Sequence, residues 1–243
     1  MKFRSVLLMA LIALSVAACE RSHPIKNTVT IKPNTVRPKI VLHPVIVELI
    51  NPRITSMGDA FGDTKSLAEW GANINQWQNR VTIFAMVRNP DELTREIKEN
   101  FHGSYDSLVV FDKPFYNFNR KLCTDTTSSK EWTNIFLTAN LVADPKLQQE
   151  YLDYHKTQFQ KWPEVSQGFC NAQFQQLLVF KSGRQLIIVI SIPKGKTLDE
   201  LNPLTTKNNP RVDEWNKTMS KYQEGLPGTK KGETWVFLKP IGS

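Results

Sequence analysis

The chain has 243 residues, of which 40% are hydrophobic and six are tryptophan. This is enough apolar material for one large or two small globular domains. Its net charge of +8 is spread along the sequence and not gathered in a basic helix with interleaved aromatic residues. This distribution indicates a solvated surface and argues against nucleic-acid binding. Long charged blocks and low-complexity tracts do not occur, which excludes a mainly disordered chain.

The first residues have the pattern of a bacterial lipoprotein signal peptide. Lys2 and Arg4 precede an apolar run that is too short to span a bilayer. The Val-Ala-Ala-Cys that follows resembles a lipobox, with Cys19 as the lipidated first mature residue. An ordinary signal peptide with a chance cysteine is the alternative. We predict a signal peptide at 1–18 and a proline-containing tether at 19–39. The mature protein is expected to be a lipoprotein of the outer membrane that faces the periplasm, with the inner membrane and the cell surface as alternative locations.

The region 40–123 is expected to contain a loose β-α-β-α-β pattern. Strands are predicted at 40–50, 80–87 and 108–111, and helices at 64–78 and 91–100. The first helix is inferred from the spacing of Leu67, Trp70, Ile74 and Trp77. The second starts with Asn89 as N-cap and Pro90 in the first helical position. An aromatic-rich connection at 115–118 follows.

A polar run at 124–130 predicts a linker, 124–131, between two halves of the chain. The second half, 132–240, has clearer signals: strands at 133–142, 173–180, 185–192 and 234–238, and helices from Asp144-Pro145 to Trp162 and after Asn209-Pro210. This β-α-β-β-α-β order is the ferredoxin-like pattern, and 40–123 is interpreted as a degenerate copy. The predicted fold is α+β, with two ferredoxin-like halves packed as an internal pseudo-dimeric α+β barrel.

One face of the strand at 133–142 is polar and aromatic. It carries Asn134, Phe136, Thr138 and Asn140, opposite an apolar face. Such a face is either solvated or lines a pocket.

Two cysteines remain after Cys19 is assigned to the lipid. In an oxidising periplasm Cys123 and Cys170 could form a disulfide, or they could stay buried as free thiols. The four histidines lie too far apart in sequence to indicate a metal site, so no metal is expected.

The candidate site centres on the helix that starts at Asp144-Pro145. Tyr151 and His155 are one turn apart on the same helix face. Proline disfavours helical geometry in the preceding residue, so the helix should end near Trp162, next to Glu164. A histidine, a tyrosine, an indole and a carboxylate would then lie close together. Such a set could move protons on a small polar ring, or it could be a well-packed helix end.

The second half resembles the L-rhamnose mutarotase family of dimeric α+β barrels. The matching features, over about 132–240, are Tyr151 with His155, Trp162-Pro163-Glu164, Asn171 before the hairpin strands, a late helix with Trp215 and Met219, and a closing strand near Trp235. The resemblance implies His155 as the proton-transferring residue, Tyr151 as its partner and Trp215 beside the sugar. Trp162, Glu164 and Asn171 are further candidates for substrate binding, with helix-end packing and strand capping as the alternatives.

Mutarotation interconverts the α and β anomers of a reducing sugar and needs only general acid–base catalysis. No metal, nucleotide or redox cofactor is expected. The first hypothesis is an exported lipoprotein that acts on a deoxyhexose such as L-rhamnose. The alternatives are a non-catalytic sugar- or protein-binding module of the same fold, and a haem-handling or monooxygenase member of the broader superfamily. The expected partners are a monosaccharide and, through the lipid, a membrane, and a homo-oligomer stays open.

Overall fold

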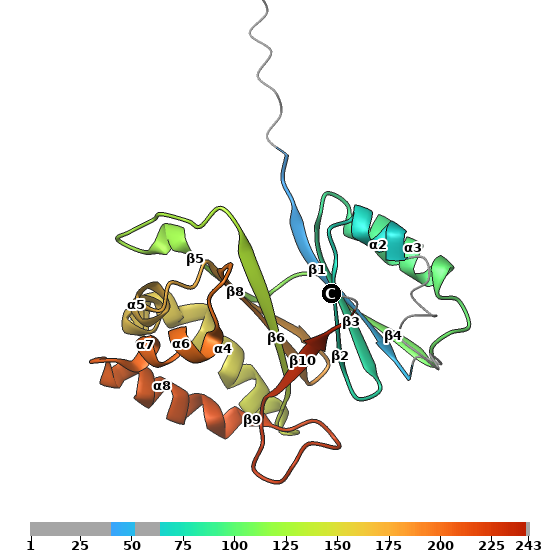
Figure 1. Cartoon of the computed structure of the whole chain (residues 1–243). Coiled ribbons are helices and arrows are strands. Elements are labelled where there is room, and N and C mark those ends of the chain that lie inside the picture. The colour runs from blue at the N-terminus through green and yellow to red at the C-terminus, as the bar shows by residue number, and fades with distance from the viewer. Residues whose placement is uncertain (1–39, 52–63, 242–243) are drawn as a thin grey trace, which may run out of the picture. The chain divides into compact units, whose positions relative to one another are not determined.

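The computed structural model describes residues 40–51 and 64–241, and its strands pair into one ten-stranded antiparallel sheet in the order β4-β1-β3-β2-β10-β6-β8-β7-β5, with β9 on β6 (Figure 1). Cys19, the predicted signal peptide and the predicted tether lie outside the described residues. Within the described residues, no helix combines the length and apolar character that a membrane span requires.

The N-terminal half contains β1 His43–Ile50, α2 Thr64–Glu69, β2 Asn73–Trp77, β3 Arg80–Val87, α3 Pro90–Asn100 and β4 Ser107–Phe111. The strands lie in the order β4-β1-β3-β2. This is a ferredoxin-like β-α-β-β-α-β arrangement. The predicted start of α3 is confirmed: the Asn89 side chain accepts hydrogen bonds from the backbone N–H groups of Asp91 and Glu92, and Pro90 opens the helix.

The predicted helix 64–78 is wrong beyond Glu69. Gly71 adopts a positive φ of 62°, and residues 73–77 form strand β2. A two-residue turn then leads into β3, with Gln78 at a φ of 49°. The apolar spacing suggested a helix, but the helix does not continue, because the backbone of 73–77 pairs with β3 on one side and with β10 on the other.

The C-terminal half repeats the pattern. It contains β6 Trp132–Leu141, α4 Pro145–Lys161, α5 Pro163–Asn171, β7 Gln176–Ser182, β8 Gln185–Pro193, α6 Leu198–Leu201, α7 Pro203–Thr206, α8 Pro210–Met219, η2 Ser220–Tyr222, β9 Gln223–Glu224 and β10 Val236–Pro240. The strands lie in the order β10-β6-β8-β7, again ferredoxin-like. The predicted hairpin between β7 and β8 is confirmed, because Ser182 pairs with Gln185 across a two-residue turn.

The aromatic-rich stretch after β4 was expected to be a connection, but it contains strand β5, Tyr116–Asn119, followed by the 3₁₀ turn η1, Arg120–Leu122. Strand β5 pairs with β7 of the C-terminal half. These residues precede the predicted linker at 124–131, yet they pack with the half that follows it.

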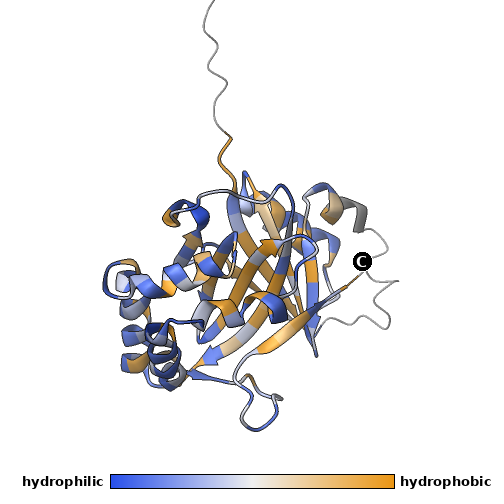
Figure 2. Ribbon diagram, turned by 60° about the vertical axis from the view of Figure 1, so that its left-hand side comes forward, coloured by the Kyte–Doolittle hydropathy of each residue, from blue (hydrophilic) through white to orange (hydrophobic). Residues whose placement is uncertain are grey.

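The helices and the sheet pack around three apolar cores. One lies between α2, α3 and the N-terminal strands, around Val47, Ile83 and Ile97. A second lies between α4, α5, α8 and the C-terminal strands. The third contains Phe84, Phe136 and other residues from both halves of the sheet, so the curled sheet faces itself across this core. The predicted fold class is confirmed, and Figure 2 shows hydrophobic residues along the strands and many hydrophilic residues along the helices.

The polar-and-aromatic face of β6 is covered by the N-terminal half. Phe136 and Thr138 are buried, and Phe84 of β3 meets Phe136 edge-on with ring centroids 5.6 Å apart. The buried carboxylate of Glu48 also joins the halves, because it accepts hydrogen bonds from Arg80 at 2.8 Å and from Gln185 at 2.9 Å. Burial raises the pKa of Glu48, and the nearby Arg80 opposes this shift.

Candidate active site

A cavity of about 400 Å³ lies between the helices and the sheet of the C-terminal half. Both predicted catalytic residues, His155 and Tyr151, line it together with Trp215. Its apolar wall consists of side chains from α5, β7, β8 and α8: Val165, Phe169, Leu177, Val179, Ile188 and Met219. Its remaining lining residues are Tyr116, Asn216, Ser220, Gln223, Thr234 and Trp235. The volume lies within the range of small-molecule sites.

Local signals set the position of α4. The Asp144 side chain caps its N-terminus by accepting hydrogen bonds from the N–H groups of Lys146 and Leu147, and Pro145 takes the first helical position. The helix ends at Lys161, and α5 begins at Pro163, as the proline predicts. This register turns one face of α4, with Tyr151 and His155, toward the sheet.

His155 is 8% exposed, and its Nδ1 lies 2.9 Å from the backbone carbonyl oxygen of Tyr151. A carbonyl only accepts, so Nδ1 carries the hydrogen and Nε2 is left as the proton acceptor. The rings of Tyr116 and Trp215 meet the imidazole edge-on, with centroids 5.3 and 5.2 Å away. Burial lowers the pKa of His155 to about 4. The histidine is therefore neutral at pH 7 and has the protonation state of a general base.

Tyr151 is 1% exposed, and its ring centroid lies 4.2 Å from that of His155. Its hydroxyl oxygen accepts a hydrogen bond from Gln223 Nε2 at 3.3 Å, while Gln223 Oε1 accepts from Trp235 Nε1 at 3.0 Å. An indole N–H can only donate, so Trp235 fixes which end of the Gln223 amide faces Tyr151. Within the described residues no acceptor engages the tyrosine proton, so it is available to a ligand. Burial raises the pKa of Tyr151, which keeps this proton in place.

Tyr116 forms another wall, and its own proton is engaged. Its hydroxyl donates to Gln158 Oε1 at 2.7 Å. Gln158 is fully buried, and its Nε2 donates to the backbone carbonyl of Trp162 at 2.6 Å. Tyr116 therefore shapes the cavity and holds the imidazole in place, but it is not poised as a second acid.

The structure brings some predicted residues together and separates others. Trp215 lines the cavity, but Trp162 lies behind it, between the Trp215 ring at 5.6 Å and the Arg211 guanidinium at 3.9 Å. Glu164 and Asn171 line a different surface cavity of about 520 Å³. His155, Tyr151 and Trp215 thus share one site, and the other three do not line it.

Tyr116, Gln158, Gln223 and Trp235 were not predicted as site residues. Tyr116 lies in the aromatic-rich stretch that the sequence marks, and Trp235 was noted only as a marker of the closing strand near it. No local pattern marks the two glutamines.

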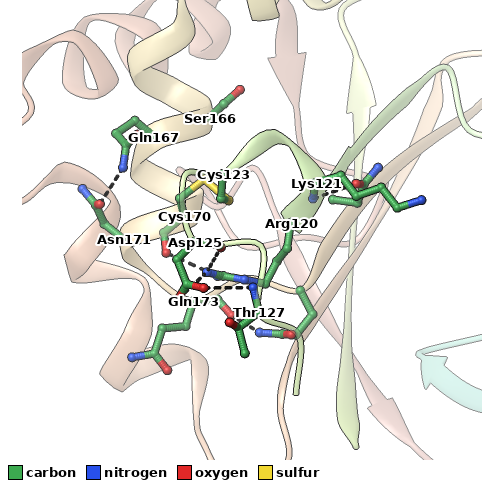
Figure 3. Close-up of a disulfide and its surroundings, with 12 residues drawn as sticks. Arg120, Lys121, Cys123, Asp125, Thr127, Ser166, Gln167, Cys170, Asn171 and Gln173 are labelled. Carbon is green, nitrogen blue, oxygen red and sulfur yellow. Dashed lines mark hydrogen bonds and ion pairs between the residues drawn. A yellow bond between two sulfur atoms is a disulfide. The ribbon is translucent and has the colours of Figure 1, made fainter. Parts of the chain in front are cut away.

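Cys123 and Cys170 form a disulfide with their Cα atoms 5.7 Å apart, which decides between the two alternatives that the sequence leaves open (Figure 3). Cys123 follows η1, and Cys170 lies on α5. Beside the bridge, Arg120 donates to the backbone carbonyl of Asp125 at 2.7 Å. The bridge ties the segment that carries Tyr116 to the helix that carries Phe169, so it braces two walls of the cavity.

The buried histidine makes stability depend on pH. In the unfolded chain His155 takes up a proton near its ordinary pKa of 6.5, whereas in the folded chain it does so only near 4. The unfolded state therefore binds more protons between these values, and stability falls as the pH decreases through this window. We expect wild type to lose about 3 kcal/mol more than His155→Asn between pH 7 and pH 4. Urea unfolding at both pH values measures this difference.

The control for this experiment is His102→Asn, because His102 is exposed. It should keep the wild-type pH dependence. Equal slopes for wild type and His155→Asn would contradict a depressed pKa at His155.

Fold and cavity together define an α+β protein of paired ferredoxin-like halves, with a neutral histidine and a protonated tyrosine in one cavity. Comparison with known proteins then names the family. Residues 135–241 match the family model described as L-rhamnose mutarotase. An L-fucose mutarotase of Xanthomonas campestris pv. campestris is 29% identical over 93 residues, covering 38% of this chain and 72% of that protein. The C-terminal half therefore resembles the mutarotase family.

The crystal structure of a monooxygenase-like protein from Listeria innocua covers 82% of this chain and 94% of its own, with a TM-score of 0.39 and 11% identity.

Proposed function

We propose that this protein is a sugar mutarotase that interconverts the α and β anomers of a deoxyhexose such as L-rhamnose or L-fucose. The observation that carries the proposal is the pair of complementary groups in one cavity: a neutral imidazole with Nε2 as proton acceptor, and a tyrosine whose proton is free. The family match of the C-terminal half supports the sugar as substrate.

In the proposed reaction, His155 Nε2 takes the proton from the anomeric hydroxyl while the Tyr151 hydroxyl gives a proton to the ring oxygen. The bond between C1 and the ring oxygen breaks, and C1 becomes an aldehyde carbon. After rotation about the C1–C2 bond, the former ring oxygen attacks the other face of C1 and returns its proton to Tyr151. His155 returns the first proton to the anomeric oxygen, so both residues end in their starting states.

Burial makes an isolated imidazolium or phenolate costly, and this favours transfers that occur together. The two charges have opposite signs and form on rings whose centroids are 4.2 Å apart, so they stabilise each other. The pair can therefore exchange protons with the sugar without a permanent charge in the cavity.

The cavity lining favours a deoxysugar. The aliphatic side chains of Val165, Leu177, Val179 and Ile188 offer no partner to a hydroxymethyl group. A methyl group at C5 matches this wall, because burying an extra hydroxyl without a hydrogen bond is costly. The indole of Trp215 provides a flat face for the C–H side of the ring.

We also propose that the mature protein is an outer-membrane lipoprotein that faces the periplasm, which the lipobox-like sequence at Cys19 supports. Incorporation of radiolabelled palmitate should be lost in Cys19→Ala. Equal labelling of the wild type and this variant would contradict lipidation at Cys19.

The function is tested by saturation-transfer NMR on the purified protein with L-rhamnose, L-fucose and D-glucose. We expect the exchange between the anomeric protons of at least one deoxysugar to accelerate in proportion to protein concentration, and D-glucose to respond less because of its hydroxymethyl group. Sugar binding without faster exchange would favour a non-catalytic binding module instead.

A further inference from the structure

A second cavity lies where the two halves of the sheet meet. Strand β10 pairs with β6 as far as Leu238 opposite Phe136, and then with β2 at Pro240 opposite Asn75. Strand β6 continues to Trp132 beyond the last residue that β10 pairs with. A cavity of about 470 Å³ occupies this junction, and none of its lining residues lines the His155 cavity.

The lining of this junction cavity combines apolar side chains with several amides and carries no ionisable side chain. Asn73 and Asn75 come from β2, and Asn134 comes from β6. Asn134 Nδ2 donates to Asn73 Oδ1 at 2.6 Å, and Ser191 donates to Asn134 Oδ1 at 2.7 Å, which holds these amides in fixed orientations. A charged ligand would find no counterion among these residues, whereas a neutral ligand with hydroxyl groups would find both donors and acceptors.

Asn75 is the observation that points to a ligand. It is 3% exposed, and within the described part of the chain its Nδ2 has no hydrogen-bond partner. Its cross-strand neighbour Thr82 has a buried hydroxyl in the same state. Buried polar groups are rarely left unpaired, so the amide of Asn75, a residue of the cavity lining, can turn its donor toward a ligand oxygen.

Trp132 supplies the other element of the junction cavity. Its side chain is 44% exposed although it is the largest residue of the lining. Its Nε1 donates to the backbone carbonyl of Ser129 at 2.9 Å, which fixes the ring. An exposed indole held in place beside amide groups can stack on the C–H face of a pyranose ring while the amides bind its hydroxyls.

We propose that this junction cavity is an accessory binding site for a neutral saccharide unit. It binds without catalysing a reaction, because no residue of the lining can transfer a proton near pH 7. The site does not depend on the mutarotase proposal, since it shares no residue with the His155 cavity.

The test is a titration of the ¹⁵N-labelled protein with the methyl pyranosides of L-rhamnose, L-fucose, D-mannose and N-acetyl-D-glucosamine, followed by NMR. Methyl glycosides cannot undergo mutarotation, so binding is observed without turnover. We expect saturable shifts of the Asn75 and Asn134 side-chain amides and of the Trp132 indole N–H with at least one of them. The same shifts should persist in His155→Asn, which separates this site from the catalytic proposal.

Two variants and a matched control complete the experiment. Trp132→Ala should weaken the affinity about tenfold, since it removes the stacking surface. Asn75→Leu should abolish the ligand-induced shifts of the Asn134 amide and the Trp132 indole. Trp132→Ala keeps the test valid if the buried Asn75→Leu variant does not fold. Phe237→Ala removes another exposed aromatic residue, 53% exposed and outside this cavity, and should bind like wild type.

The proposal is overturned if none of the glycosides produces saturable shifts up to its solubility limit. It is also overturned if the Asn75 amide contacts only water, or if Trp132→Ala and Phe237→Ala bind equally well.

Discussion

Replacing His155 with asparagine is expected to lower the rate of protein-catalysed anomer exchange by about 100- to 10,000-fold, the range for loss of a general acid–base group. The asparagine amide can still hydrogen-bond in the buried site, but it cannot accept a proton from the anomeric hydroxyl. The exchange rate is measured by saturation-transfer NMR on whichever deoxysugar the wild type accelerates. Near-ultraviolet circular dichroism verifies that the variant keeps its packing.

Two further variants identify which group acts. Tyr151→Phe keeps the ring contacts with His155 and removes only the hydroxyl that Gln223 contacts. It should also lose activity, because it removes the proton that is proposed to reach the ring oxygen. His102→Asn changes an exposed histidine outside the site and should be fully active. If His155→Asn is folded and as active as wild type, the catalytic assignment is wrong.

Removing the disulfide with the double change Cys123→Ala and Cys170→Ala is expected to lower the free energy of unfolding by about 4 kcal/mol. The bridge joins residues 47 positions apart, and opening it releases a loop of that length in the unfolded chain. Guanidinium unfolding of the oxidised wild type and of the variant measures the loss.

A reducing agent provides the matched control for the disulfide. It should lower the stability of the wild type to a similar extent and leave the double variant unchanged. A loss of less than about 1 kcal/mol would contradict a main role in constraining the unfolded chain. Because the bridge braces the segments of Tyr116 and Phe169, the variant should also bind the sugar more weakly.

Much of the C-terminal half could be predicted because its signals are local. The Asp144-Pro145 start of α4, its end before Pro163, and the four-residue spacing of Tyr151 and His155 depend on neighbours in sequence. The β7–β8 hairpin also follows from a short turn between β-branched runs. Such features depend on helix caps, prolines and turn residues that adjoin them in sequence.

The errors arose where remote pairing decides the structure. Residues 73–77 have apolar spacing that fits a helix, but they form a strand because they pair with β3 and with β10. Strand β10 lies more than 150 residues further along the chain. Strand β5 likewise exists because β7 offers it an edge. Trp162, Glu164 and Asn171 are near His155 in sequence, yet the turn at Pro163 directs α5 so that Glu164 and Asn171 line another cavity.

By itself, the sequence determined the β-α-β-β-α-β order of the main elements in the C-terminal half, the helix that carries His155 and Tyr151, and the face that they share, since short-range geometry controls all three. Only the tertiary structure decided what these two groups can do. Burial behind Tyr116 and Trp215 keeps the imidazole neutral, and Trp235 orients the Gln223 amide that leaves the tyrosine proton free. Solvent exclusion and hydrogen-bond direction depend on residues brought together from distant strands and helices, and no local sequence pattern encodes them.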